Sequence, residues 1–384
     1  MIYLDHAATT PADPRVIAAM NRCMEQAWLN PSAAYAGAGV ARRTLRLARQ
    51  AVAGMLNAEP QEIVFTSGGT EANNQAMALA RGGHAVVSAI EHASVLRAAE
   101  ALCREVTLVA PEPDGRVRPE AVERALRPDT KLISVQLANN ETGALQPVHE
   151  IGALARARRV PLHCDAVQAF GHVPVDVKAL KADMLSLSGH KLYGPRGVGA
   201  LYVRQGVLPP PLLLGGGQEL GRRAGTENLP AIAGLMAAAE LAAEDMAERA
   251  AREAALLSDF CAALTRRVSG CRLLAEASPR LPGIAALLLP GRPSEAMIAR
   301  LDAAGILVSG GAACASREPG PSHVYRAMGL RETDANCVLR VSVGRENTAA
   351  DMRAAADAIV KIMSQRDGSF DSLSRFNESK EPSL

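Results

Sequence analysis

One lysine stands where two apolar strands of the chain should meet. Lys191 follows a polar turn, residues 188–190, between the apolar alternation of residues 184–187 and a second apolar run, 198–203. An amine at the end of a buried strand is unfavourable unless it is solvated, paired or chemically used. Desolvation favours the neutral, nucleophilic amine, which forms a Schiff base with an aldehyde cofactor. A turn lysine that reaches solvent along its own methylene stem is the alternative interpretation.

Asp165 and Gln168 follow another short apolar run, residues 160–164. If that run is a parallel strand, both side chains lie at its carboxyl end, where open α/β sheets bind ligands. A carboxylate at that place keeps the ring nitrogen of a pyridine cofactor protonated, so that the ring accepts electrons. The other interpretation of Asp165 is a helix N-cap, a common role for aspartate.

A glycine turn that contains Gly69 and Thr70 joins a strand pattern, residues 62–67, to a helical pattern over residues 71–80. Free backbone N–H groups, the helix dipole and the threonine hydroxyl together favour an anion such as a phosphate. The sequence matches neither the P-loop nor the dinucleotide-binding glycine pattern. A tight, capped turn without a ligand is the alternative.

Composition narrows the classes of function. The 384 residues include 42 basic and 40 acidic side chains, so no charge excess indicates nucleic acid or a membrane as a partner. The seven cysteines contain no C-x-x-C pair, which argues against a zinc site or a disulfide framework and favours a reducing compartment. No basic and apolar leader and no apolar run of membrane length is visible. We therefore expect a cytoplasmic protein without a metal that acts on a small molecule.

The elements that must hold these groups alternate between strands and helices. Four short apolar runs are each followed by a helical pattern: 63–66, 85–89, 106–109 and 132–137. This rhythm predicts an α/β fold, a mostly parallel sheet with helices on both faces. An alanine-rich helical stretch, 230–267, leads to a smaller set of strands and helices. We expect a large domain over 15–254, a smaller α+β domain from 1–14 and 255–363, and a disordered tail over 364–384.

In these motifs the chain resembles the cysteine desulfurases, enzymes of the class V aminotransferase family that depend on pyridoxal 5'-phosphate (PLP) and have PLP fold type I. The resemblance covers residues 3–345, nearly the whole chain. Its seven blocks stand in the family's order: FTSGGTE at 65–71, EH at 91–92, ANNETG at 138–143, DAVQ at 165–168, SGHK at 188–191, RAGTEN at 223–228 and SGGAAC at 309–314. It implies a seven-stranded, mostly parallel sheet flanked by helices and PLP as the cofactor.

The resemblance gives several of these residues a role toward the ring of PLP. It implies that Lys191 binds the cofactor covalently, that Asp165 holds the ring nitrogen, and that His92 stacks on the ring and moves protons. Asn140 and Gln168 would contact the phenolic side of the ring. Taken alone, a histidine that follows a strand, as His92 does, is more often a structural residue that is hydrogen-bonded to a carbonyl.

The phosphate of the cofactor is expected near the glycine turn. By resemblance, its contacts come from Gly69, Thr70, Ser188 and His190. In the family a threonine of the neighbouring subunit also reaches this phosphate, and the matching residue here is Thr226. The resemblance therefore implies a homodimer in which both subunits contribute to each site.

Two further residues make the expectation specific. Cys314 lies in a segment rich in small residues and proline, 309–322, which suits an exposed loop in which a thiolate is available as a nucleophile. Arg340 lies in an apolar run, 338–343, and by resemblance its planar fork clamps the substrate carboxylate with help from Asn140. An arginine that faces solvent from an edge strand is the alternative for Arg340.

The resemblance implies a sulfurtransferase that converts L-cysteine to L-alanine and leaves the sulfur on Cys314 as a persulfide. Lys191 removes the Cα proton in this reaction. The sulfur then passes to an acceptor protein, an iron–sulfur scaffold or similar, for iron–sulfur cluster assembly or nitrogen fixation. The alternatives are a selenocysteine lyase or a PLP aminotransferase of the same superfamily, and a non-catalytic sulfur-relay scaffold. The chain departs from the family's pattern at Tyr35 and at residues 317–320.

Overall fold

The computed structural model describes residues 1–311 and 320–365. Seven strands form one sheet in the order β2-β8-β7-β6-β5-β3-β4. Their bounds are Ile63–Thr66 (β2), His84–Ser88 (β3), Glu105–Val109 (β4), Thr130–Ser134 (β5), Leu162–Asp165 (β6), Met184–Ser188 (β7) and Gly199–Val203 (β8). Strand β8 runs antiparallel to both of its neighbours, and the other neighbouring pairs are parallel. The predicted mostly parallel sheet is confirmed.

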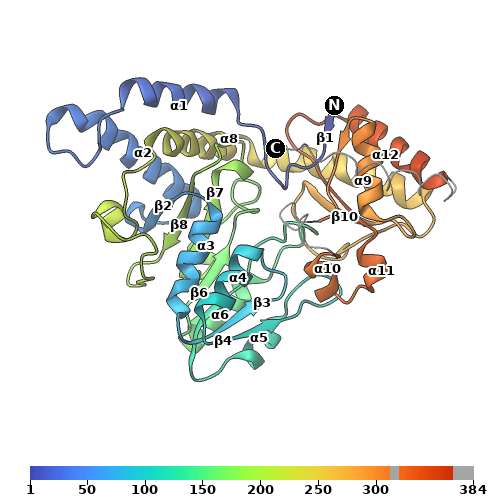
Figure 1. The fold of residues 1–384 in the computed structure, drawn as a ribbon, viewed down its shortest axis with the longest axis horizontal. Helices are drawn as coiled ribbons and strands as arrows, with labels where there is room; N and C mark the ends of the chain where they lie inside the picture. Colours follow the sequence, from blue (N-terminus) through green and yellow to red (C-terminus); the bar gives the residue numbers. More distant parts are fainter. Residues whose placement is uncertain (312–319, 366–384) are drawn as a thin grey trace, which may run out of the picture.

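Helices cover both faces of this sheet (Figure 1). The helices α3 (Gly69–Met77) and α4 (Ala93–Leu102) pack on one face. The helices α2 (Gly39–Leu56) and α6 (Val148–Arg158) and the first part of α8 (Leu229–Arg267) pack on the other. Because successive strand residues point to opposite faces, Ile63 and Phe65 join one core and Val64 joins the other. Strands buried on both faces explain the nearly continuous apolar runs of the sequence.

The long helix α8 (Leu229–Arg267) connects the large sheet to the rest of the molecule. It has 39 residues and is therefore about 60 Å long. The side chain of Asn228 caps its start by accepting a hydrogen bond from the backbone N–H of Ala231. The first part of α8 contributes Leu235 to the core of the large sheet, whereas the last part contributes Phe260 to a second core.

The second core surrounds a three-stranded antiparallel sheet in the order β12-β10-β9. Its strands are Arg272–Leu273 (β9), Ile284–Leu288 (β10) and Val338–Ser342 (β12), and the helices beside it are α9 (Ser294–Ala303), α10 (His323–Ala327), α11 (Glu332–Ala335) and α12 (Ala349–Ser364). The N-terminal strand β1 (Ile2–Tyr3) pairs in parallel with β11 (Ile306–Leu307). The first residues of the chain therefore lie beside a strand from the last quarter of the sequence, on the side of the molecule that holds the smaller sheet (Figure 1).

Most expected elements are confirmed within one or two residues at their ends. The short elements β9, α11 and α7 (Val177–Leu180) were not predicted, because two to four residues carry no measurable periodicity. The other bounds are α1 (Pro14–Gln26), α5 (Pro119–Ala125), and the 3₁₀ turns η1 (Ala36–Ala38), η2 (Pro60–Glu62), η3 (Ala78–Ala80), η4 (Gly189–Lys191) and η5 (Gln218–Gly221). Within residues 1–311 and 320–365, none of the helices has the length and apolarity needed to cross a membrane.

Candidate active site

A cavity of about 180 Å³ opens where β6 and β7 end. It lies at the carboxyl edge of the parallel strands, as expected for a ligand site in an open α/β sheet. Ten of the twelve site residues expected from the sequence line this cavity: Gly69, Thr70, His92, Asn140, Asp165, Gln168, Ser188, His190, Lys191 and Arg340. The structure therefore brings together residues that are spread over 272 positions of the chain, from 69 to 340.

Lys191 lies at the end of η4, directly after strand β7. Its Nζ donates hydrogen bonds to the carbonyl oxygens of Ala7 (2.6 Å) and Ala8 (2.8 Å), two residues that also line the cavity. The alternative of a lysine that extends into solvent is therefore wrong. The N-terminal segment supplies these two carbonyls, which sequence reasoning did not find.

Asp165 is the last residue of β6 and is 7 % exposed. Its Oδ1 accepts a hydrogen bond from the backbone N–H of Val167 (2.9 Å), and its Oδ2 accepts one from Nδ2 of Asn73 (2.7 Å). No helix starts at this residue, so the N-cap interpretation is wrong. Asn73 was missed, although its position four residues after Gly69 places it on the helix face above that turn.

The start of α3 forms one wall of the cavity. Gly68 has φ 154°, and no side chain caps the first N–H groups of this helix. A Cβ on Gly69 would lie 2.7 Å from Cγ2 of Val167, so only glycine fits there without a shift. An uncapped helix N-terminus beside Ser188 and Thr70 is well suited to bind an anion.

His92 caps the helix α4 and also lines the cavity. Its Nδ1 accepts a hydrogen bond from the backbone N–H of Ser94 (3.1 Å). This capping contact is a different one from the hydrogen bond to a carbonyl that the structural interpretation named. His190, on the other side, is close to Thr9 Oγ1 (3.1 Å). Burial and the neighbouring Lys191 charge lower the pKa of His190 to about 4, which makes this ring neutral at pH 7.

Arg340 enters the cavity from strand β12 of the smaller sheet. It is 1 % exposed, so the interpretation as an arginine facing solvent is wrong. Its Nη2 donates to Oδ1 of Asp5 (2.6 Å) and its Nη1 donates to the carbonyl of Asn140 (2.9 Å), while Nε has no partner among the described residues. The guanidinium is thus held in place with part of its hydrogen-bonding capacity unused.

A second layer of buried polar side chains lies behind Asp165. Oε1 of Glu91 accepts hydrogen bonds from Oγ of Ser88 (2.8 Å) and from the backbone N–H of Gln136 (2.7 Å). Burial, and next the charge of Asp165, raise the pKa of Glu91 to about 8. Burial also lowers the pKa of His163 to about 4. Both groups are therefore neutral at pH 7. Among the described residues that line the cavity, Asp165 is the acidic one.

Two expected residues, Thr226 and Cys314, remain to be placed. Thr226 lies in a separate hollow together with Trp28 and Pro230, and the expectation placed it against the neighbouring subunit. Cys314 lies outside the described residues. The segment that precedes Cys314 is described up to residue 311. It contacts the cavity wall, because Ser309 and Arg340 exchange backbone hydrogen bonds.

The donor set of the cavity fits PLP. Lys191 offers an amine for the aldehyde, Asp165 offers a buried carboxylate for the ring nitrogen, and the start of α3 offers N–H groups for the phosphate. Three different groups of one cofactor thus find three matching partners in a single cavity.

Comparisons with known proteins give the family. The model of the protein family described as "Aminotransferase class-V" matches residues 2–354. "Cysteine desulfurase IscS" of Clostridium botulinum is 40 % identical over 376 residues, which are 95 % of this chain and 95 % of that protein. The chain belongs to the cysteine desulfurases of the aminotransferase class-V family. "Putative cysteine desulfurase IscS 1" of Bacillus subtilis is 41 % identical over 94 % of this chain and 98 % of its own length.

Solved structures of proteins with similar sequences share this fold. A NifS-like protein from Rickettsia africae superposes with a TM-score of 0.88 at 33 % identity, over 94 % of this chain and 99 % of that one. SspA in complex with cysteine superposes with a TM-score of 0.80 at 35 % identity, over 91 % of this chain and 100 % of that one. The expected PLP fold type I and PLP dependence of the family are thereby confirmed.

Proposed function

We propose that this protein is a PLP-dependent cysteine desulfurase that converts L-cysteine to L-alanine and transfers the sulfur to Cys314 as a persulfide. The observation that carries the proposal is the meeting of Lys191, Asp165 and Arg340 in one cavity. The names of the curated relatives and the solved complex of SspA with cysteine support the substrate.

The proposed chemistry divides the work among residues of the cavity wall. Bound PLP supplies an electron sink for the charge that develops at the substrate Cα. Asp165, oriented by Asn73 and by the N–H of Val167, keeps the proton on the ring nitrogen. Lys191 takes the proton from Cα and returns it later. The carbonyls of Ala7 and Ala8 orient its Nζ between these steps.

Arg340 is proposed to bind the substrate carboxylate. Its fork is planar and permanently charged, which suits two parallel hydrogen bonds to a carboxylate. Its Nη2 donates to Asp5 and its Nη1 donates to the carbonyl of Asn140. The N–H groups of the guanidinium that these two contacts do not use can bind the substrate carboxylate. The proposed contact of the Asn140 side chain places a second polar group beside the same carboxylate.

Sulfur transfer requires a thiol nucleophile, and the described residues that line the cavity include no cysteine. In the proposed step the Cys314 thiolate attacks the substrate sulfur, an S–S bond forms, and the substrate Cβ–S bond breaks. The electron pair of that bond remains with Cβ, which takes up a proton. The net reaction consumes one thiol and one cysteine and gives one persulfide and one alanine, so no external oxidant is needed.

The wider setting of this reaction is also proposed. Thr226 would complete the site of a partner subunit in a homodimer, and an iron–sulfur scaffold or a similar protein would accept the sulfur. The six free cysteines among the described residues support a reducing, cytoplasmic compartment. The division into a large domain, 15–254, and a small one, 1–14 with 255–363, is part of the same proposal.

The test is a product analysis with matched cysteine variants. The purified protein is incubated with L-cysteine and a thiol reductant, and alanine and sulfide are measured. We expect equal amounts of both from the wild type and none from Lys191→Ala or Cys314→Ser. Cys103→Ser is the control, because Cys103 is half-buried and lies outside the cavity. Keto acid without sulfide would replace the proposal by an aminotransferase, and absence of turnover would replace it by a sulfur-relay scaffold.

A further inference from the structure

His172 joins the turn of Lys191 to the long helix α8. It lies seven residues after Asp165, at the end of the turn that follows β6. Its Nε2 is 2.8 Å from the carbonyl oxygen of Lys191, and its Nδ1 is 3.2 Å from Nη1 of Arg249. One imidazole therefore bridges the main chain of the candidate reactive lysine and a guanidinium on α8.

The chemistry of the two partners fixes the direction of both hydrogen bonds. A guanidinium only donates, so Nδ1 of His172 accepts from Arg249. The proton of the neutral ring is then on Nε2, which donates to the carbonyl of Lys191. Burial, and next the charge of Arg249, lower the pKa of His172 to about 4, in agreement with a neutral ring that has one fixed tautomer.

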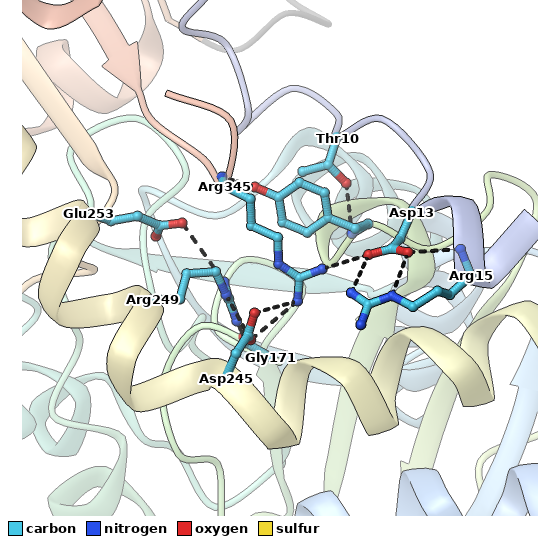
Figure 2. Close-up of polar contacts among 9 residues, drawn as sticks. Thr10, Asp13, Arg15, Gly171, Asp245, Arg249, Glu253 and Arg345 are labelled. Atoms are coloured by element: carbon cyan, nitrogen blue, oxygen red, sulfur yellow. Dashed lines mark hydrogen bonds and ion pairs between the residues drawn. The ribbon is translucent and has the colours of Figure 1, made fainter. Parts of the chain in front are cut away.

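Arg249 is itself held on several sides (Figure 2). It is 5 % exposed, donates through Nη2 to the carbonyl of Gly171, and donates through Nε to Oδ1 of Asp245 (3.2 Å). Asp245 also pairs with Arg345 at 3.0 Å, and Glu253 lies 4.0 Å from Arg249. Anchored contacts of this kind keep the guanidinium at the place where His172 needs a donor.

The opposite side of the Lys191 turn is fastened by the N-terminal segment. The carbonyl of His190 accepts hydrogen bonds from the N–H (3.0 Å) and Oγ1 (2.9 Å) of Thr10. His172 serves the next carbonyl along the chain, that of Lys191. Loss of its N–H would leave this carbonyl without the side-chain donor that now holds it, and the lysine would gain freedom where its geometry matters.

We propose that Arg249 and His172 are positioning residues, which act as one hydrogen-bond chain to fix the main chain of Lys191 for its reaction with an aldehyde. The proposal rests on the proposed function insofar as that function makes Lys191 the reactive amine. Neither residue lines the cavity, so the two act on Lys191 and not on the substrate. Substrate binding through Arg340 is therefore left unchanged by their loss.

The test first compares four single-residue variants of the protein. His172→Phe keeps a ring of similar shape and removes both hydrogen bonds, His172→Gln retains a donor and an acceptor, and Arg249→Met removes the guanidinium. The control is His84→Phe. His84 is a buried histidine with two side-chain partners, Thr130 and Thr107. It lies at the amino end of strand β3, whereas the cavity opens at the carboxyl edge of the sheet. It reports the effect of losing a buried imidazole away from the cavity.

Two readouts separate this proposal from the function itself. The first does not depend on cysteine turnover. It is the rate at which apoprotein mixed with PLP recovers the absorbance of the bound cofactor, and it is supported by amide hydrogen exchange of residues 189–194. We expect His172→Phe and Arg249→Met to slow recovery by about tenfold and to speed exchange. His172→Gln should stay within about threefold of the wild type. The second readout is turnover of cysteine, in which kcat falls about tenfold and KM is unchanged.

The double variant His172→Phe with Arg249→Met should be no slower than either single variant, because both break the same chain. Recovery rates of His172→Phe equal to those of His84→Phe would overturn the proposal, and so would a His172→Gln variant as slow as His172→Phe. If the wild type recovers PLP but does not consume cysteine, the proposed function fails while the recovery rates still judge the two positioning residues.

Discussion

The pH dependence of stability should change when Glu253 loses its charge. The side chain of Glu253 is 1 % exposed, and its Oε1 has no hydrogen-bond partner within residues 1–311 and 320–365. Burial raises the pKa of Glu253 from 4.5 to about 7, and the opposing attraction of Arg249, 4.0 Å away, is the weaker effect. In the unfolded chain the carboxyl ionises near 4.5, so between these two values the folded protein binds more protons than the unfolded one.

The sign follows from this difference in bound protons. Below pH 4.5 both states are protonated and Glu253 costs nothing through ionisation. As the pH rises to about 7 the folded state loses stability, and above that value the cost is constant. With about 1.4 kcal/mol for each unit of pKa, the shift from 4.5 to about 7 amounts to about 3 kcal/mol. Glu253→Gln, which does not titrate, avoids this loss.

The assay is urea unfolding of the wild type and Glu253→Gln at pH 5 and pH 8. We expect the free-energy difference between the two proteins to move by about 2 to 3 kcal/mol in favour of the variant between these values. Glu248→Gln is the control, since Glu248 is exposed on the same helix and should show no such change. A pH-independent difference for Glu253→Gln would refute the reasoning that burial dominates at this position.

The remaining predictions concern the cavity. Arg340→Lys keeps the charge and loses the fork, so KM for cysteine should rise about tenfold with the PLP spectrum retained, and an unchanged KM would remove Arg340 from the substrate site. Gly69→Ala places a Cβ 2.7 Å from Val167, so PLP affinity, measured by titration of the apoprotein, should fall about tenfold; wild-type affinity would contradict the anion site. Asn73→Ala deprives Asp165 of a donor and should lower kcat about tenfold at constant KM; unchanged kcat would argue against its orienting role.

Site residues could be predicted from the sequence where the residues next to them along the chain show a strand or a helix start. Lys191 and Asp165 could be placed at one edge of the sheet because both follow buried strands, and parallel strands end on the same side. Gly69 could be assigned to a helix start because glycine, hydroxyl and helical pattern follow one another. These predictions rest only on residues that are close together in the sequence.

Contacts between distant segments could not be predicted in this way. The carbonyls of Ala7 and Ala8 hold the amine of Lys191, although they are 184 and 183 residues away in sequence. A backbone oxygen leaves no signature in the residue type, so no pattern points to it. His172 is a polar residue after a turn, and only the fold brings it to Arg249 on the long helix.

The central claim is that this protein moves sulfur from L-cysteine to Cys314. The most direct measurement is peptide mass spectrometry after anaerobic incubation of the PLP-loaded protein with L-cysteine and without reductant. The account predicts one added sulfur atom on the peptide that contains Cys314, and none on the peptides of the six other cysteines. Alanine formation without added sulfur on Cys314 would contradict the account.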